Sequence, residues 1–297
     1  GRDSGEGGDD ASRPLAAREI KRATQSAEPE EDVIEWCAKL AHSDTDNAYR
    51  LIAHVGVDLV VMAQEKAKDA YWGVWTGSHW DFATGRARSL ALSQHIGERI
   101  AEEASFLQMT DAQEAVMKAA ADALAKAENE RTDADQKRID AAFKVREAFK
   151  KRAGQRIQFG VSSKNSSRLE AMLKCAAPHV MKSPDAFNAD HFKVAVKGHT
   201  LAFTHGPEQD LNPDWEREDR PADAPQFITV KKARCTATKG HRREDFITEV
   251  IPTAYKEGAT CPLWIAFLEE FLPDPAVRKL VQVAFGLGLL GVTVQRL

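Results

Sequence analysis

Two clusters of basic side chains are the residues whose type and spacing suggest chemistry with an anion. The first cluster contains Lys144, Arg146, Lys150, Lys151, Arg152, Arg156, Lys164 and Arg168. The second contains Lys231, Lys232, Arg234, Lys239, Arg242 and Arg243, with His241 among them. Either cluster could neutralise phosphates, which would make binding steeply dependent on salt concentration. The alternatives are a solvated helix face for the first cluster and, for the second, an exposed strand edge kept soluble by its charges.

The chain shows no self-sufficient active site. It lacks a phosphate-cradling G-x-x-x-x-G-K-[ST] loop and the G-x-S-x-G turn that presents a nucleophilic serine. The segment 286–291, Gly-Leu-Gly-Leu-Leu-Gly, has the spacing of a dinucleotide-binding fingerprint but follows a helix-forming stretch instead of a strand. We interpret its glycines as helix-packing residues.

Histidines and acidic residues in the middle of the chain do not form a recognisable metal motif. The three nearest histidines are His191, His199 and His205. They would have to converge in space to bind a metal, and no cysteine or paired acidic residue accompanies them. The acidic residues of the next segment are Glu216, Glu218 and Asp219. We expect both groups to be solvated, and we expect no cofactor or metal in this chain.

Composition limits the class of protein. With 297 residues, 43% hydrophobic and 29% charged, the chain is globular and forms one large domain or two ordinary ones. A net charge of -4 excludes a polycation that binds nucleic acid through its overall charge. The cysteines form no C-x-x-C pair, so reduced thiols are expected. No apolar run could span a bilayer and no secretory signal is present, which favours the cytoplasm.

A tryptophan-rich segment, Tyr71–Asp81, is central to the elements that position these clusters. Its Thr-Gly-Ser centre predicts a tight β-hairpin in which Gly77 adopts a positive φ. Trp72, Trp75 and Trp80 could stack on nucleic-acid bases. We favour the alternative that they form the core of a small α+β unit.

The remaining elements follow from apolar periodicity and from capping residues. Ser43 predicts the N-cap of a helix, with Asp46 completing a capping-box pattern and Gly56 ending the helix. A buried strand is predicted at 57–62. Further helices are predicted at 89–106, 111–130, 133–152, 166–180, 262–271 and 275–290. Short strands are predicted at 191–196, 200–203, 227–230 and 246–250, with an irregular loop at 206–225.

These elements predict an α+β fold that is predominantly α. The composition predicts a flexible linker or tail at 1–31. It predicts the helix–hairpin unit plus an Ala-rich helical bundle at 32–185. We predict a small β-rich part at 186–259 and a pair of helices at 260–297.

Several short segments, in order along the chain, share motif residues with a known family. They are 43–51, the hairpin Trp72–Asp81, 194–201, 243–248, 259–268 and 286–291. Together they resemble the domain that precedes the superfamily 3 helicase core in phage, plasmid and poxvirus primase–helicases. The resemblance extends from about Ile34 to Leu297.

The resemblance implies a non-catalytic, helicase-associated module of a phage or mobile-element replication protein. In that family an ATPase that uses ATP and Mg²⁺ lies downstream and a primase often lies upstream. The helices at 261–290 would correspond to the start of the collar that helps to hold subunits together. The implied partners are single-stranded or forked DNA, the protein's own helicase and primase domains, and further copies of the full-length protein. The implied setting is the cytoplasm of a bacterial host, without a membrane.

The basic clusters supply the candidate DNA contacts. They are Lys150, Lys151, Arg152, Arg156, Lys231, Lys232, Arg234, Lys239, Arg242 and Arg243. One alternative is an oligomerisation or interdomain scaffold without affinity for DNA. Another is a priming enzyme, against which no acidic triad with the spacing of a two-metal polymerase is visible.

Overall fold

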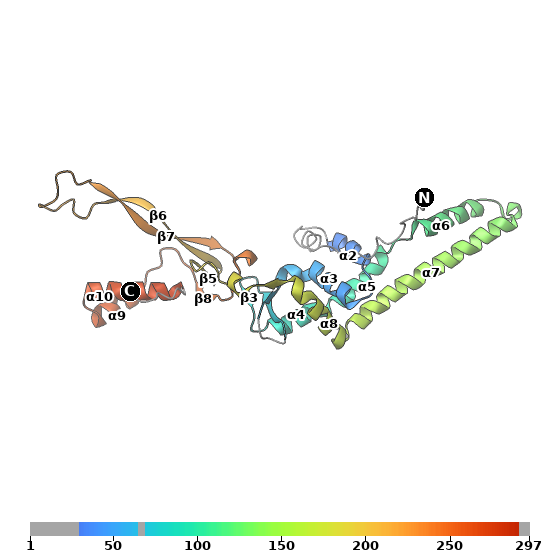
Figure 1. The fold of residues 1–297 in the computed structure, drawn as a ribbon, viewed down its shortest axis with the longest axis horizontal. Coiled ribbons are helices and arrows are strands. Elements are labelled where there is room, and N and C mark those ends of the chain that lie inside the picture. The colour runs from blue at the N-terminus through green and yellow to red at the C-terminus, as the bar shows by residue number, and fades with distance from the viewer. Residues whose placement is uncertain (1–29, 65–68, 291–297) are drawn as a thin grey trace, which may run out of the picture. The chain divides into compact units, whose positions relative to one another are not determined.

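The computed structural model describes residues 30–64 and 69–290, so the predicted tail lies almost wholly outside the described residues (Figure 1). The chain divides into two compact units. Within the described residues, unit 1 contains 30–64, 69–74 and 83–182, and unit 2 contains 75–82 and 183–290. No helix in the described part has the length and apolar character needed to cross a membrane.

Unit 1 is mainly helical. Its helices are α2 (Glu30–Ala38), α3 (Asp44–Val55), α4 (Gly85–Gln94), α5 (Ile96–Glu102), α6 (Asp111–Leu124), α7 (Asp133–Ser163) and α8 (Ser166–Ala176). Its short 3-10 helices are Gly56–Asp58, Glu103–Phe106, Glu128–Glu130 and Ala177–His179. Strands β1 (Leu59–Met62), β2 (Tyr71–Trp75), β3 (Trp80–Asp81) and β4 (Met181–Lys182) form a sheet in the order β3-β2-β1-β4. β3 and Trp75 belong to unit 2, because the chain crosses between the units within the hairpin.

Helices α3, α6 and α7 each begin directly after a residue that caps their first turn. The Ser43 hydroxyl accepts a hydrogen bond from the Asp46 backbone N–H at 3.0 Å, which confirms Ser43 as the N-cap of α3. Thr110 and Thr132 begin α6 and α7 with complete capping boxes. Local sequence therefore determines where these three helices begin.

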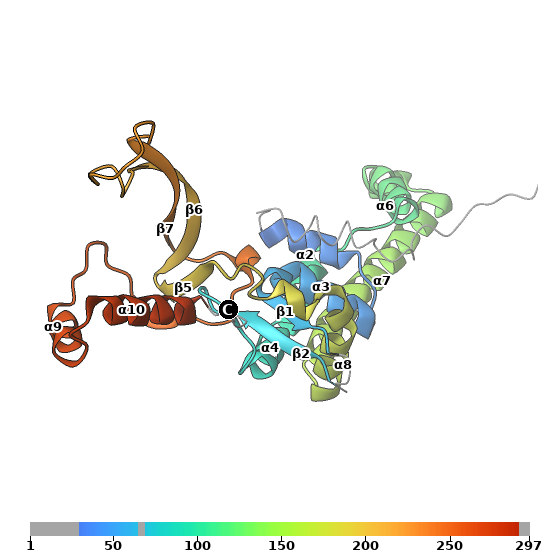
Figure 2. The same cartoon turned by 60° about the vertical axis from the view of Figure 1, so that its left-hand side comes forward.

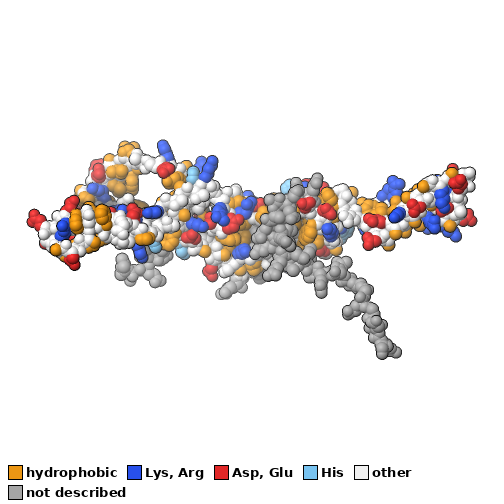
Figure 3. Space-filling view, turned by 90° about the horizontal axis from the view of Figure 1, so that it is seen from above, with side chains coloured by type: hydrophobic (Ala, Val, Ile, Leu, Met, Phe, Trp, Pro, Cys, Tyr) orange, Lys and Arg blue, Asp and Glu red, His pale blue; other side chains and the backbone are white. Residues whose placement is uncertain are grey.

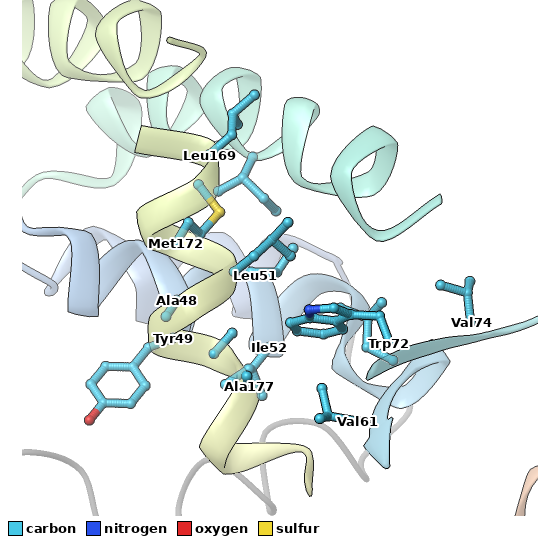
Figure 4. Packing of buried hydrophobic residues seen from close by; sticks show 14 of the residues in the cluster. Ala48, Tyr49, Leu51, Ile52, Val61, Trp72, Val74, Leu169, Met172 and Ala177 are labelled. Atoms are coloured by element: carbon cyan, nitrogen blue, oxygen red, sulfur yellow. The ribbon is translucent and has the colours of Figure 1, made fainter. Parts of the chain in front are cut away.

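The core of unit 1 lies where α3 and α8 pack together beside the sheet. Leu51 of α3 and Met172 of α8 are fully buried, and Trp72 of β2 is 2% exposed (Figure 4). Figure 4 shows the indole of Trp72 beside Ile52. Trp72 is therefore a core residue, as we favoured from the sequence.

Two glycines allow a close crossing of α5 and α7. A Cβ on Gly160 would lie 2.5 Å from the Gly97 carbonyl oxygen, and a Cβ on Gly97 would lie 2.6 Å from the Gly160 carbonyl oxygen. These are the helix-packing glycines of the described chain. By contrast, the Cβ positions of Gly286 and Gly288 meet nothing within 4 Å beyond their own helix backbone and chain neighbours, so these glycines pack against no other element of the described chain.

Unit 2 contains the second sheet and the last two helices. Its strands are β5 (Lys193–Lys197), β6 (His199–Leu211), β7 (Phe227–Lys239) and β8 (Ile251–Ala254), in the order β7-β6-β5-β8. β6 is antiparallel to both β5 and β7, and β8 runs parallel to β5. The helices are α9 (Pro262–Phe271) and α10 (Pro275–Leu289), with short 3-10 helices at Pro184–Ala186 and Arg243–Asp245.

An aromatic cluster stabilises unit 2 around the hairpin tip. The Trp80 ring lies 5.6 Å from the Trp75 ring and 6.1 Å from the Phe246 ring, and its indole N–H donates to the Arg243 carbonyl at 2.9 Å. Trp75 and Trp80 are buried, which confirms the core interpretation of the hairpin tryptophans. Gly77 has a φ of 93°, as its turn requires.

The α+β, predominantly α fold class is confirmed, but several element bounds differ from the predictions. The predicted helix 89–106 is broken into α4, α5 and a 3-10 turn, and α7 continues eleven residues beyond 152 to Ser163. The predicted loop 206–225 is wrong in its first part, because 206–211 extend β6. The strand predicted at 246–250 lies instead at Ile251–Ala254, since Phe246 adopts a left-handed φ of 48°.

Candidate nucleic-acid interface

The second basic cluster lies largely on a long two-stranded ribbon in unit 2. β6 and β7 pair from His199–Lys239 to Leu211–Phe227, thirteen residues on each strand. Figure 2 shows the two strands curving side by side. Residues that are opposite one another share a face, and successive residues alternate between faces. The register therefore assigns each ribbon side chain to one of two faces.

One face, which we call the charge-balanced face, carries equal numbers of cations and anions. Lys232 Nζ lies 3.2 Å from an Asp210 carboxylate oxygen and 3.6 Å from one of Glu208. Arg234 Nη2 donates to Glu208 at 3.3 Å. The hydrogen bond to Asp210, followed by the charges of Asp210 and Glu208, raises the pKa of Lys232. The acidic side chains of the paired strand β6 therefore largely neutralise these two cations of β7.

The opposite face, which we call the acid-free face, carries Lys231 and Lys239 and no Asp or Glu. Both lysines are exposed, and neither forms an ion pair with another residue in the described ranges. Phe203 and Phe227 share this face, and the side chain of Phe227 is 55% exposed. This face therefore combines unpaired positive charge with accessible aromatic surface.

Arg242 and Arg243 lie at the base of the ribbon. The guanidinium of Arg243 lies 5.7 Å from the centre of the Trp75 ring, while exposed Arg242 lies 3.5 Å from Glu244. His241 lies in the sequence between β7 and these two arginines. Burial, followed by the charges of His199 and His79, lowers the pKa of His241. The shift favours the neutral form of the His241 imidazole.

The first basic cluster is divided by the structure into exposed and enclosed residues. Lys150 pairs with Glu147 at 2.9 Å, and Lys151 is exposed without an ion pair to any described residue. Arg152 is half-buried, donates to the Gln108 carbonyl and lies 5.1 Å from the Phe149 ring. The helix is therefore not a continuous basic face.

Arg156 does not lie on the exposed helix face predicted for it. It is 7% exposed, and its guanidinium donates to the Glu103 carboxylate and to the Leu40 carbonyl. Arg50 shares the same carboxylate, with its Nε donating to Glu103 Oε1 at 2.7 Å. The side chain of Arg156 therefore has a structural role, because it joins α7 to α2 and to the turn after α5.

A lysine row on α7 was only partly identified from the sequence. Lys137, Lys144 and Lys151 recur every seven residues, so they are about 10 Å apart on one helix face. All three are exposed, and none forms an ion pair with a described residue. Figure 3 shows blue and red side chains intermingled along the α6–α7 end of unit 1. The seven-residue spacing in the sequence could have identified Lys137 as a member of this row.

The histidines and acidic side chains of the described residues do not cluster into a metal centre. The described part of the chain contains no group of three or more His, Cys, Asp or Glu side chains placed to hold a metal ion. His191 and His205 are exposed, whereas His199 lies beside the Tyr255 ring at 5.7 Å. The exposed basic residues described above are hydrogen-bond donors and cations, which suit the binding of an anion.

Comparison with known proteins gives one match. The family model described as D5 N terminal like matches residues 48–273, about three quarters of the chain. No curated protein and no solved structure matches the chain. The matched range includes the Trp-rich hairpin, α7 and both ribbon strands, and it ends before α10.

Proposed function

Because the chain belongs to the D5 N-terminal-like family, the N-terminal domain of phage and poxvirus primase–helicases, we propose that it is the part of such a replication protein that contacts DNA. On this proposal the chain is non-catalytic, and ATP and Mg²⁺ are used by a helicase core elsewhere in the full-length protein. The observation that supports DNA contact most strongly is the acid-free face of the β6–β7 ribbon.

The chemistry of that face suits a nucleic-acid backbone. Lys231 and Lys239 are eight residues apart on β7, about 27 Å along the strand, so they could contact phosphates several nucleotides apart. A two-stranded ribbon is narrow enough to enter the major groove of a duplex. Phe227 offers a ring on which an unpaired base could stack.

The test compares two double variants. Lys231→Gln with Lys239→Gln removes two cations from the acid-free face, and we expect about tenfold weaker binding of forked DNA with a salt slope lower by about 2. The control, Glu208→Gln with Lys232→Gln, removes an ion pair from the charge-balanced face without changing net charge. We expect the control to leave affinity and salt slope unchanged. Equal affinity and slope for both variants and the parent chain would refute the proposed DNA surface.

The scaffold alternative is supported by a different observation. α9 and α10 bury no side chain, and Leu280 and Phe285 are 69% and 67% exposed. A cavity of about 530 Å³ is lined by both helices, including Trp264 and Leu268. Large exposed apolar surfaces commonly mark protein interaction sites. Concentration-dependent assembly without retention of DNA, measured by sedimentation velocity, would favour this alternative.

A further inference from the structure

A second basic site lies within unit 1 and shares no residue with the proposed DNA surface. A cavity of about 280 Å³ is bounded by α2, α7 and the segment that follows α5. Three cationic side chains line it, Lys39, Arg152 and Arg156, and no acidic side chain does. Phe106 and Leu107 form an apolar part of the cavity wall, and Gln108 forms a polar part.

The positive charge around this cavity exceeds the negative charge. Glu103 is the carboxylate that pairs with Arg156, and it also receives two hydrogen bonds from Arg50. Two buried guanidinium groups therefore share a single carboxylate, and Arg152 and Lys39 have no carboxylate partner in the described chain. Burial lowers the pKa of Arg156, and the charges of Arg50 and Arg152 act in the same direction.

Two hydrogen-bond donors of the arginines that line the cavity are unused. The Nε atoms of Arg152 and Arg156 are buried and have no acceptor among the described residues. Arg152 Nη2 donates to the Gln108 carbonyl, and both Nη atoms of Arg156 donate, to Glu103, Ala38 and Leu40. Buried donors are normally satisfied, and an unsatisfied one needs an explanation. Both Nε atoms are closed to solvent, so an anion in the adjoining cavity would reach them only after the two side chains shift.

We propose that this cavity binds a phosphate group. Guanidinium groups match the oxygen geometry of phosphate, and a flexible lysine at the rim adds a third charge. The cavity volume lies just below the range of about 300–1,000 Å³ that is usual for small-molecule sites, so it fits a phosphate or diphosphate with little else enclosed. The group could belong to a free nucleotide or to the phosphorylated end of a DNA strand.

The primary experiment titrates the full chain with pyrophosphate in a calorimeter, with sodium chloride held constant. We expect saturable binding to one site. Arg152→Gln and Lys39→Gln should each weaken it at least tenfold, because each removes a charge at the cavity. The control Lys151→Gln removes an equal charge from the exposed neighbour of Arg152 and should leave binding unchanged. Arg156 is left intact because its pairing with Glu103 is structural.

Three results would overturn the assignment. One is the absence of saturable pyrophosphate binding by the folded parent chain. Another is equal binding by the parent, Arg152→Gln and Lys151→Gln chains, which would show non-specific attraction to basic surface. Preference for a dicarboxylate such as succinate over pyrophosphate would also contradict a phosphate site.

Two further arms identify the source of the phosphate and separate this site from the ribbon. Competition of pyrophosphate by dATP would assign a nucleotide, whereas competition by a 5′-phosphorylated oligonucleotide and not by its 5′-hydroxyl form would assign a strand end. Lys231→Gln with Lys239→Gln should leave pyrophosphate binding intact. Loss of DNA affinity in that variant alone and loss of pyrophosphate affinity in Arg152→Gln alone would therefore distinguish the two sites.

Discussion

Unit 1 and unit 2 differ in how completely each covers its own side chains. Unit 1 encloses an apolar core between α3, α8 and the sheet, and it even encloses charged residues, with Glu103 paired to Arg50 and Arg156. Unit 2 has a smaller aromatic core, while its ribbon and its helices α9 and α10 remain largely exposed. Unit 1 is therefore stabilised largely by its own buried contacts, whereas unit 2 leaves much of its apolar and charged surface exposed.

The largest effect is expected where unit 1 buries charge. Glu103→Ala would leave Arg50 and Arg156 buried without their carboxylate, so we expect a loss of about 3–5 kcal/mol in the free energy of unfolding. Urea unfolding followed by circular dichroism measures it. Glu102→Ala, at the exposed neighbouring position, should cost less than about 1 kcal/mol because only a surface pair with Arg99 is lost. Similar losses for both variants would contradict the comparison.

The second effect concerns the close crossing of α5 and α7. Gly160→Ala would place a methyl group against the Gly97 carbonyl, and we expect a loss of about 1–3 kcal/mol from overpacking. Gly154→Ala lies on the same helix in open space and should instead stabilise the chain by about 0.5–1 kcal/mol. Thermal unfolding of the two variants should therefore shift in opposite directions. A shift in the same direction would show that the helices do not cross at these glycines.

A third prediction concerns pH and the α6–α7 connection. The Lys126 ammonium, then the Thr132 backbone N–H and hydroxyl, lowers the pKa of Asp135 by hydrogen bonding to its carboxylate. Because the folded pKa lies below the unfolded value of about 3.9, this carboxylate stabilises the fold above that pH. The stabilisation should be lost as pH falls below 3.9 toward the folded pKa.

Asp135→Asn provides the measurement for that prediction. The variant should be less stable than the parent at pH 7, and the difference between them should shrink as pH is lowered toward 3. Unfolding midpoints measured across this range give the comparison. A difference that stays constant with pH would show that the charge of Asp135 contributes nothing.

The smallest effect on stability is expected in unit 2. Leu280→Ser replaces an apolar side chain that is 69% exposed, so the free energy of unfolding should change by no more than about 0.5 kcal/mol. The matched core variant in unit 1, Leu173→Ala, should cost about 2–5 kcal/mol because Leu173 is 1% exposed. A large loss of stability for Leu280→Ser would mean that α10 is packed more tightly than its exposure indicates.

Much of the local structure could be predicted from the sequence because it depends on neighbouring residues. Ser43 and Thr110 mark the starts of their helices, since each caps backbone N–H groups within its own first turn. Gly77 marks its turn because few other residues adopt a positive φ. The family motifs were also readable, and the matched range includes most of them.

The tertiary structure decided which basic residues are available. From spacing alone, Arg156 resembled its exposed neighbours on α7, and only packing against Glu103 shows that it is buried. Lys231 and Lys232 are adjacent in sequence, yet the β6–β7 register leaves the first unpaired and places the second beside Asp210. The physical reason is that burial and strand register depend on residues far apart in the chain, whereas caps and turns depend on a few consecutive ones.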